Sequence, residues 1–214
     1  MKLSSSLRSF ALVAALLAPL AVAPRAFAGD DAHAPAAVKE KHPRVTVDAT
    51  FERYVLDPHG RVRALLLKDG SLVHAPEGAV RDTSMRAGDA LKIEAHARAV
   101  SGVTLYGRAL VKKNGVVVVD ATQKVEQTKA KGKLTDVSAS SNVSYFLYGP
   151  KGHIRGVVLA DGTSAHAGKG ALLDEYKLKK GDAVTLTGKG GSYALGRAMR
   201  IETIKLPNGD VKKL

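Results

Sequence analysis

The sequence predicts a mainly β protein in which one small barrel-forming unit occurs twice in tandem. Three observations support this prediction: segments that alternate between apolar and polar residues, turn dipeptides placed between those segments, and a duplication that keeps its order along the chain. We expect the units at residues 45–120 and 134–214, joined by a polar, lysine-rich linker at residues 121–133.

The duplication is the strongest signal in the chain. It consists of five matches, which follow one another in the same order in both halves. The clearest of them are turn dipeptides: Asp69-Gly70 with Asp161-Gly162, Gly88-Asp89 with Gly181-Asp182, and Asn114-Gly115 with Asn208-Gly209. Chance could produce any one of these matches, but not five in register. The second half is therefore a copy of the first.

The strands of the first unit can be assigned in chain order. The expected strands are residues 45–56, 62–67, 71–75, 91–99 and 103–112, followed by a short added strand at 116–119. Asp69-Gly70 supplies the two positive-φ positions that a two-residue type I′ hairpin needs. Residues 91–99 alternate strictly between apolar and polar, which indicates a half-buried strand. In the second unit the added strand is expected at residues 211–214.

A short helix is expected between the third and fourth strands of each unit. In the second unit it covers Gly170 to Leu178, where Leu172, Leu173 and Tyr176 share one helical face. Gly181 suits the end of such a helix. The corresponding segment of the first unit, Glu77 to Arg86, has a weaker helical pattern.

This order of elements resembles the OB-fold, a five-stranded Greek-key barrel. The Asp-Gly and Gly-Asp elements, present in both units, also resemble the barrel pattern of a family of uncharacterised exported bacterial proteins. The resemblance covers residues 45–115 and 136–206. It implies two tandem OB-like barrels, each with a helix between strands three and four and an extra C-terminal hairpin strand. It implies little about activity, because one fold hosts many functions.

The first 28 residues have the features of a secretory signal peptide. Lys2 and Arg8 precede an apolar run over residues 10–23, and Ala26-Phe27-Ala28 suits cleavage after Ala28. The run is shorter than the roughly 20 residues of a spanning helix. We therefore expect a periplasmic or secreted protein without a transmembrane span, and disorder over the Ala/Pro-rich residues 29–44.

The charge of the chain favours an anionic partner. The full sequence has a formal net charge of +13, and loss of Lys2, Arg8 and Arg25 with the signal would leave +10. An anionic polymer or an envelope component would suit that surplus. A basic protein without such a partner is the plainer alternative. Nucleic acid is a poorer expectation, because exported proteins rarely meet it.

The chain lacks the residues that several kinds of catalytic or metal chemistry require. The chain has no cysteine, and its seven histidines include no pair at metal-binding spacing, so neither a metal nor another cofactor is expected. It also lacks the Gly-x-Ser-x-Gly nucleophile motif and a paired-carboxylate arrangement on one face of a helix. These observations predict a protein that is not an enzyme.

Ligand binding remains, and OB-like barrels bind on the face of strands two and three, framed by adjacent loops. The candidate residues at those places are basic: Arg61, Arg63, His74, Arg108, His153, Arg155, His166 and Arg197. His74 and His166 occupy the same position in the two units, and each either lines a ligand or closes a barrel end. The sequence leads to a binding module for an anionic partner. A structural or assembly protein of the cell envelope and a single-stranded nucleic-acid-binding protein are the alternatives.

Overall fold

The computed structural model describes residues 43–123, 133–149, 151–168, 170 and 173–214. The expected signal peptide lies outside these residues, as do most of the expected disordered segment and of the linker. Both repeated units fall within one compact part of the chain, Glu40–Leu214. Within the described residues, the structure contains no helix long and apolar enough to cross a lipid bilayer.

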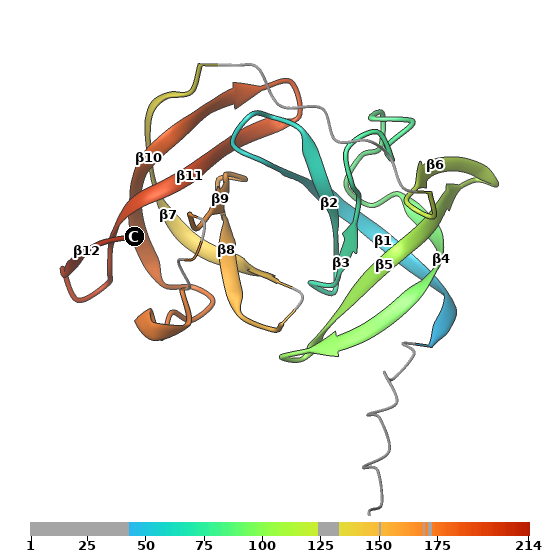
Figure 1. Cartoon of the computed structure of the whole chain (residues 1–214), viewed down its shortest axis with the longest axis horizontal. Coiled ribbons are helices and arrows are strands. Elements are labelled where there is room, and N and C mark those ends of the chain that lie inside the picture. The colour runs from blue at the N-terminus through green and yellow to red at the C-terminus, as the bar shows by residue number, and fades with distance from the viewer. Residues whose placement is uncertain (1–42, 124–132, 150, 169, 171–172) are drawn as a thin grey trace, which may run out of the picture. The chain divides into compact units, whose positions relative to one another are not determined.

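The first repeat folds into a closed barrel, called barrel 1 below. Its strands are β1 (Arg44–Leu56), β2 (Val62–Leu67), β3 (Leu72–His74), β4 (Ala90–Val100), β5 (Val103–Lys113) and the added β6 (Val116–Asp120). They form a sheet in the order β3-β2-β1-β4-β5-β6, in blue to green in Figure 1. Parallel pairing of β3 with β5 closes the barrel, and all other neighbouring strands are antiparallel.

The second repeat forms barrel 2, which has the same topology. Its strands are β7 (Thr135–Tyr148), β8 (Ile154–Leu159), β9 (Ser164–His166), β10 (Ala183–Tyr193), β11 (Gly196–Lys205) and the added β12 (Val211–Lys213). The order is β10-β7-β8-β9-β11-β12, with β10 also paired to β11 and β9 parallel to β11 (Figure 1). The prediction of a mainly β protein with two five-stranded barrels and an extra strand on each is confirmed, and the closure is consistent with an OB-like fold.

The residue pattern explains the strands and their turns. Leu91, Ile93 and Ala95 of β4 point into the core of barrel 1, while Lys92 between them is exposed. The turns after β2 and β8 place Gly70 and Gly162 at φ +86° and +89°, a conformation that glycine adopts without steric cost. Asp69 does not have a positive φ, so the predicted type I′ turn is wrong and only its glycine position is confirmed. Alternation therefore sets the faces of each strand, and the Asp-Gly dipeptides set where each hairpin turns.

The predicted helices between strands three and four are wrong. In barrel 2 the described part of the segment, residues 170 and 173–178, contains a 3₁₀ turn, Asp174–Tyr176, and no α-helix. Gly170 before the turn and Lys177 after it have positive φ values, which an α-helix does not allow. In barrel 1, none of residues 77–86 is helical. There the Asp82 carboxylate accepts the Ser84 backbone N–H at 2.8 Å, and such local bonds compete with those of a helix.

Each barrel has its own apolar core, and a third cluster connects the two barrels. Fully buried members of the cores include Phe51 and Ile93 in barrel 1 and Leu186 and Ile201 in barrel 2. The third cluster takes residues from both barrels: Val55, Leu66, Leu72, Leu147 and Val158. We call these five residues the inter-barrel cluster. Because it is as thoroughly buried as the cores, the barrels pack against each other as well as within themselves.

Candidate functional site

The turn between β1 and β2 is the centre of a network of hydrogen bonds and ion pairs. The side-chain carboxylate of Asp57 accepts the backbone N–H groups of His59 and Arg61 at 2.9 and 3.0 Å. The backbone N–H of Gly60 donates to the Asp57 carbonyl at 2.8 Å, and Gly60 has φ +82°. An aspartate before Pro-His-Gly suits this turn, because its side chain holds the backbone that follows.

Two arginines and a glutamate complete this network in barrel 1. Arg61 donates to the Asp57 carboxylate through Nε at 2.8 Å and lies 2.7 Å from it through Nη2. The other arm of Arg61 reaches Glu77 at 2.7 Å, and Arg63 Nε lies 3.6 Å from Asp57. Burial alone would raise the pKa of Asp57, but the hydrogen bonds from Arg61 outweigh it and lower that pKa. Asp57 is therefore a buried, ionised carboxylate.

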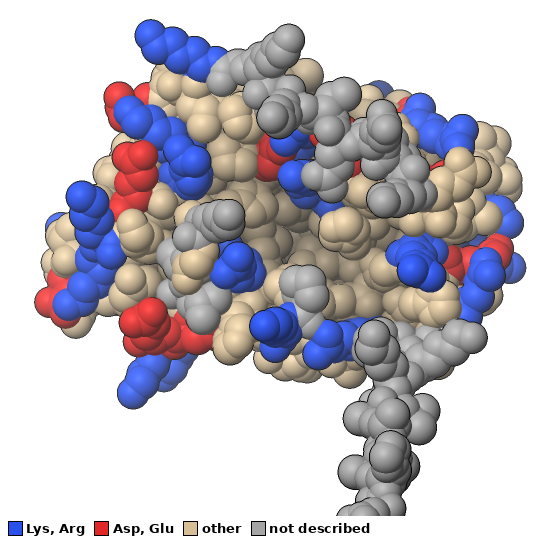
Figure 2. Space-filling view, in the orientation of Figure 1, with Lys and Arg blue, Asp and Glu red and all other residues tan. Residues whose placement is uncertain are grey.

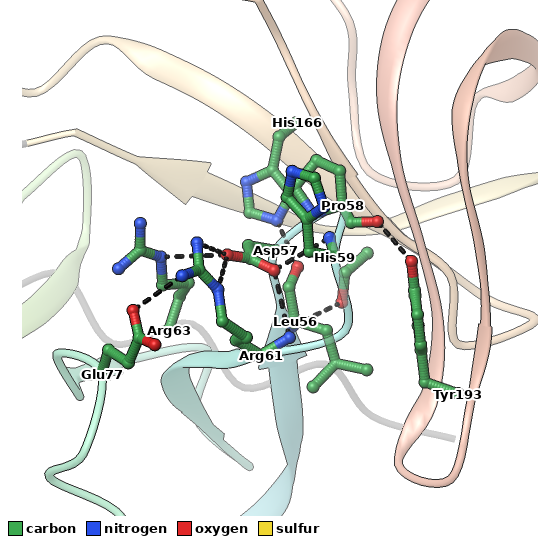
Figure 3. A network of polar contacts seen from close by, with 10 residues as sticks. Leu56, Asp57, Pro58, His59, Arg61, Arg63, Glu77, His166 and Tyr193 are labelled. Atoms are coloured by element: carbon green, nitrogen blue, oxygen red, sulfur yellow. Dashed lines mark hydrogen bonds and ion pairs between the residues drawn. The ribbon is translucent and has the colours of Figure 1, made fainter. Parts of the chain in front are cut away.

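Barrel 2 contacts the same turn through three polar side chains. His166 Nε2 donates to the Leu56 carbonyl at 2.6 Å, and Ser164 Oγ accepts the Leu56 N–H at 3.3 Å. The Tyr193 hydroxyl donates to the Pro58 carbonyl at 2.5 Å. Figure 3 shows these contacts converging on the turn. We call this set the inter-barrel network: Leu56, Asp57, Pro58, Arg61, Arg63, Glu77, Ser164, His166 and Tyr193.

The contacts between the barrels are made by residues at equivalent positions of the two repeats. In the inter-barrel cluster, Val55 corresponds to Leu147 and Leu66 to Val158, as the strand registers show. The β1–β2 and β7–β8 turns also contact the opposite barrel at equivalent positions. Gly60 of barrel 1 faces the Tyr193 ring, and Gly152 of barrel 2 faces Val100, which is the counterpart of Tyr193. The repeats therefore pack through the same face on each barrel, as the subunits of a two-fold symmetric dimer do.

This packing covers the face for which the sequence predicted a ligand. Strands β2 and β3 supply Leu66 and Leu72 to the inter-barrel cluster, and β8 supplies Val158. The predicted candidates Arg61, Arg63 and His166 lie together, as members of the inter-barrel network. His166 has a structural partner in the Leu56 carbonyl. An extended ligand on this face would have to displace the opposite barrel.

The other predicted residues are not part of that network. His74 is exposed, although desolvation of its ring and then repulsion from Arg63 lower its pKa. Arg108 is exposed and has φ +49°, and Arg197 lies 3.6 Å from Asp161. His153 lies 3.7 Å from Asp174, and Arg155 is partly buried beside Gly149. These cations are spread over both barrels.

Sequence reasoning missed the residues that organise the network. Asp57, Ser164 and Tyr193 are not among the predicted site residues, which were chosen for their positive charge. Each of the three is replaced in the other repeat, by Gly149, Leu72 and Val100. That replacement was itself a usable signal. A polar residue present in only one of two otherwise matching turns points to a contact that only one turn makes.

The polar groups of the inter-barrel network bind one another. Among the described residues, no group of three or more His, Asp or Glu side chains could hold a metal ion. The carboxylates of Asp57 and Glu77 are bound to Arg61. Comparisons with protein-family models, with curated proteins and with solved structures found no match to this chain. The function has to be inferred from the surface chemistry of the two barrels.

Proposed function

We propose that the chain is an exported, non-catalytic binding protein with two OB-like barrels, and that it binds an anionic polymer through barrel 2. The observation that carries the proposal is where the positive charge lies. Residues 134–214 contain 12 Lys and Arg against 7 Asp and Glu, whereas residues 45–120 contain 11 against 9. Figure 2 shows Lys and Arg side chains over the surface, with Asp and Glu among them.

Ion pairing sharpens the difference between the barrels. In barrel 1 many cations are close to carboxylates: Arg44 and Lys112 to Glu94, Arg61 to Asp57, Arg81 to Asp120, and Lys113 to Asp89. In barrel 2 seven exposed cations have no ion pair within the described residues: Lys151, Lys177, Lys179, Lys180, Arg200, Lys205 and Lys213. The corresponding set among the described residues of barrel 1 has four members: Lys68, Arg86, Lys92 and Arg108. Cations without a nearby carboxylate are the ones that an external anion can reach.

The two alternative functions have weaker support. Single-stranded nucleic acid needs a basic groove with exposed rings, and here the β2–β3 face is covered, while Tyr54 and Tyr106 are buried. Assembly through the edge strands would need free backbone on β6 or β12. Backbone bonds to Ala79 and Arg81 cover one end of β6. Strand β12 has only three residues, two of them lysines, which discourages edge pairing.

Retention on a polyanion tests this proposal. Reversal of Lys177, Lys179 and Lys180 to Glu should lower the salt concentration that elutes the purified protein from heparin. The control is a triple reversal in barrel 1 with the same net charge, Lys68, Arg86 and Lys92 to Glu, which should shift elution much less. Equal shifts would show a response to net charge alone. Absence of retention of the unaltered protein would overturn the proposal.

Export is tested separately by the mass of the mature protein. If residues 1–28 are a signal peptide, the protein recovered from the periplasm or medium of an expressing bacterium should begin at Gly29. Recovery of the full-length chain from the cytoplasm alone would contradict this part of the proposal.

A further inference from the structure

The outer surface of barrel 2 presents two rows of residues that cross four adjacent strands. The strand registers place one row as Ser140, Thr185, Lys205 and Val211, and the next as Ser138, Thr187, Thr203 and Lys213. Neighbouring strands lie about 4.8 Å apart, so each row is about 14 Å long. We call these eight residues the hydroxyl face. Their side chains point outward, because Ala139, Val184, Leu186 and Ile204 between them are buried.

Four of the five hydroxyl groups of this face are held in pairs. Ser140 Oγ lies 2.9 Å from Thr185 Oγ1, and Thr187 Oγ1 lies 2.5 Å from Thr203 Oγ1. Each hydroxyl has one donor and two acceptor sites, so a pair keeps further sites for an external partner. The β-branched threonines have few rotamers, and ordering them on a ligand costs little entropy. The two rows of the hydroxyl face therefore present preoriented hydrogen-bonding groups.

Positive charge lies at one end of the face. Lys205 and Lys213 are exposed and have no ion pair within the described residues, and Val211 between them is 64% exposed. Three carboxylates of the surrounding strands and turns interact with other lysines. Asp136 lies 2.5 Å from the ammonium group of Lys189, in the next row, Glu202 also interacts with Lys189, and Asp210 lies 3.5 Å from Lys212. The two lysines of the hydroxyl face are therefore open to an external anion.

Barrel 1 has different chemistry at the equivalent place. Its corresponding rows contain Asp48, Lys92 and Lys112, then Thr46, Glu94 and Leu110. Glu94 accepts a hydrogen bond from Lys112 at 3.0 Å, and Arg44 lies 3.8 Å from it. The charges on that face neutralise one another. The combination of hydroxyl groups with unpaired lysines is therefore specific to barrel 2.

We propose that the hydroxyl face binds an acidic polysaccharide of the uronate class, an inference that rests on the proposed binding of anionic polymers. Serine and threonine hydroxyls match the hydroxyl groups of sugars, Lys205 and Lys213 match the uronate carboxylates, and Val211 can pack against the C–H face of a sugar ring. Nucleic acid would also supply anions. None of the eight residues is aromatic, however, and base stacking needs rings.

The test uses hydroxyl removal that leaves the charge unchanged. Thr185→Val and Thr187→Val together keep the side-chain shape but delete two hydrogen-bonding groups. Binding of oligogalacturonate, measured by calorimetry, should weaken by about tenfold or more. Lys205→Glu and Lys213→Glu should abolish it. The matched control Lys68→Glu and Arg86→Glu changes the net charge equally on barrel 1 and should leave binding close to that of the unaltered protein.

The outcomes separate this inference from the proposed function. Loss of oligogalacturonate binding in the valine variant, with heparin retention unchanged, would support a sugar-specific hydroxyl face. Equal binding by the valine variant and the unaltered protein would overturn the inference but leave charge-driven binding intact. Tighter binding of a thymidine oligonucleotide than of oligogalacturonate would overturn it in favour of a nucleic-acid partner. Circular dichroism of each variant checks that the barrels remain folded.

Discussion

The turn after the first strand has a similar backbone in both barrels but carries different side chains. Gly60 donates to Asp57 at 2.8 Å and Gly152 to Gly149 at 2.9 Å. The side chains differ, because Asp57 collects two backbone N–H groups and Arg61, whereas Gly149 has no side chain. The fold needs only the backbone of this turn. The Asp57 carboxylate binds groups of barrel 1 and also interacts electrostatically with His166 of barrel 2.

The same contrast holds across the interface. The apolar half uses equivalent residues on both sides, such as Leu66 and Val158. The polar half is one-sided: Ser164, His166 and Tyr193 of barrel 2 bond to the barrel 1 turn, and none of their counterparts makes such a bond among the described residues. Apolar contact can be symmetric because it has no direction, whereas each hydrogen bond needs a particular donor and acceptor.

The largest effect should follow from removing an apolar residue of the interface. Leu66→Ala empties a fully buried site in the inter-barrel cluster and should lower the free energy of unfolding by about 2–5 kcal/mol. Val158→Ala, at the equivalent position, should cost less because it removes fewer carbon atoms. Urea denaturation followed by far-ultraviolet circular dichroism measures both. Two separate transitions, with only one shifted by Leu66→Ala, would contradict the idea that the cluster couples the barrels.

The second comparison substitutes equivalent glycines. Gly60 and Gly152 have similar φ values, +82° and +88°, so alanine adds a similar backbone strain of about 1–2 kcal/mol at each. At Gly60 the new Cβ would also overlap the Tyr193 ring, whereas at Gly152 it would meet Val100 Cγ1 at an ordinary 3.5 Å. Overpacking costs about 1–3 kcal/mol more. Gly60→Ala should therefore destabilise the protein more than Gly152→Ala in the same urea titration, and equal losses would show that Tyr193 moves aside freely.

The fold could be predicted because its signals are local. Strand alternation at Leu91 and Ile93 and the positive φ of Gly70 and Gly162 depend on a few neighbouring residues. The helix at Gly170 to Leu178 was predicted from composition and from one shared apolar face. That prediction failed because Gly170 and Lys177 both take positive φ, which excludes an α-helix through these two positions. Propensity is a weak guide over so short a segment.

The candidate site could be predicted only in part, because it depends on how two barrels pack. The sequence singled out Arg63 and His166, and both lie near Asp57. No local pattern shows that His166 would reach the Leu56 carbonyl, 110 positions away in the chain. The hydroxyl face was equally hidden, since Thr187 and Thr203 become neighbours in the same row only once β10 and β11 are paired. Such sites depend on how strands that are far apart in the sequence pair and pack, which local patterns do not show.

The smallest effect concerns pH and compares the two equivalent histidines. Burial lowers the pKa of His166 below 6.5, although the Leu56 carbonyl and Asp57 oppose this, and Arg63 lowers it further. The folded protein then binds fewer protons than the unfolded chain, so stability is full above about pH 6.5 and falls as the pH drops toward the lowered pKa. Asp57 adds no loss in this window, because its pKa lies below 3.8.

His166→Gln should flatten this decline, because glutamine can still donate to the Leu56 carbonyl and cannot be protonated. Thermal melts of the two proteins between pH 7 and pH 5 would show it. His74→Gln should flatten the decline less, since His74 is exposed and solvent weakens the effect of its lowered pKa. A larger effect of His74→Gln than of His166→Gln would contradict this view. It would show that the one-sided polar network around His166 does not determine how the barrels pack.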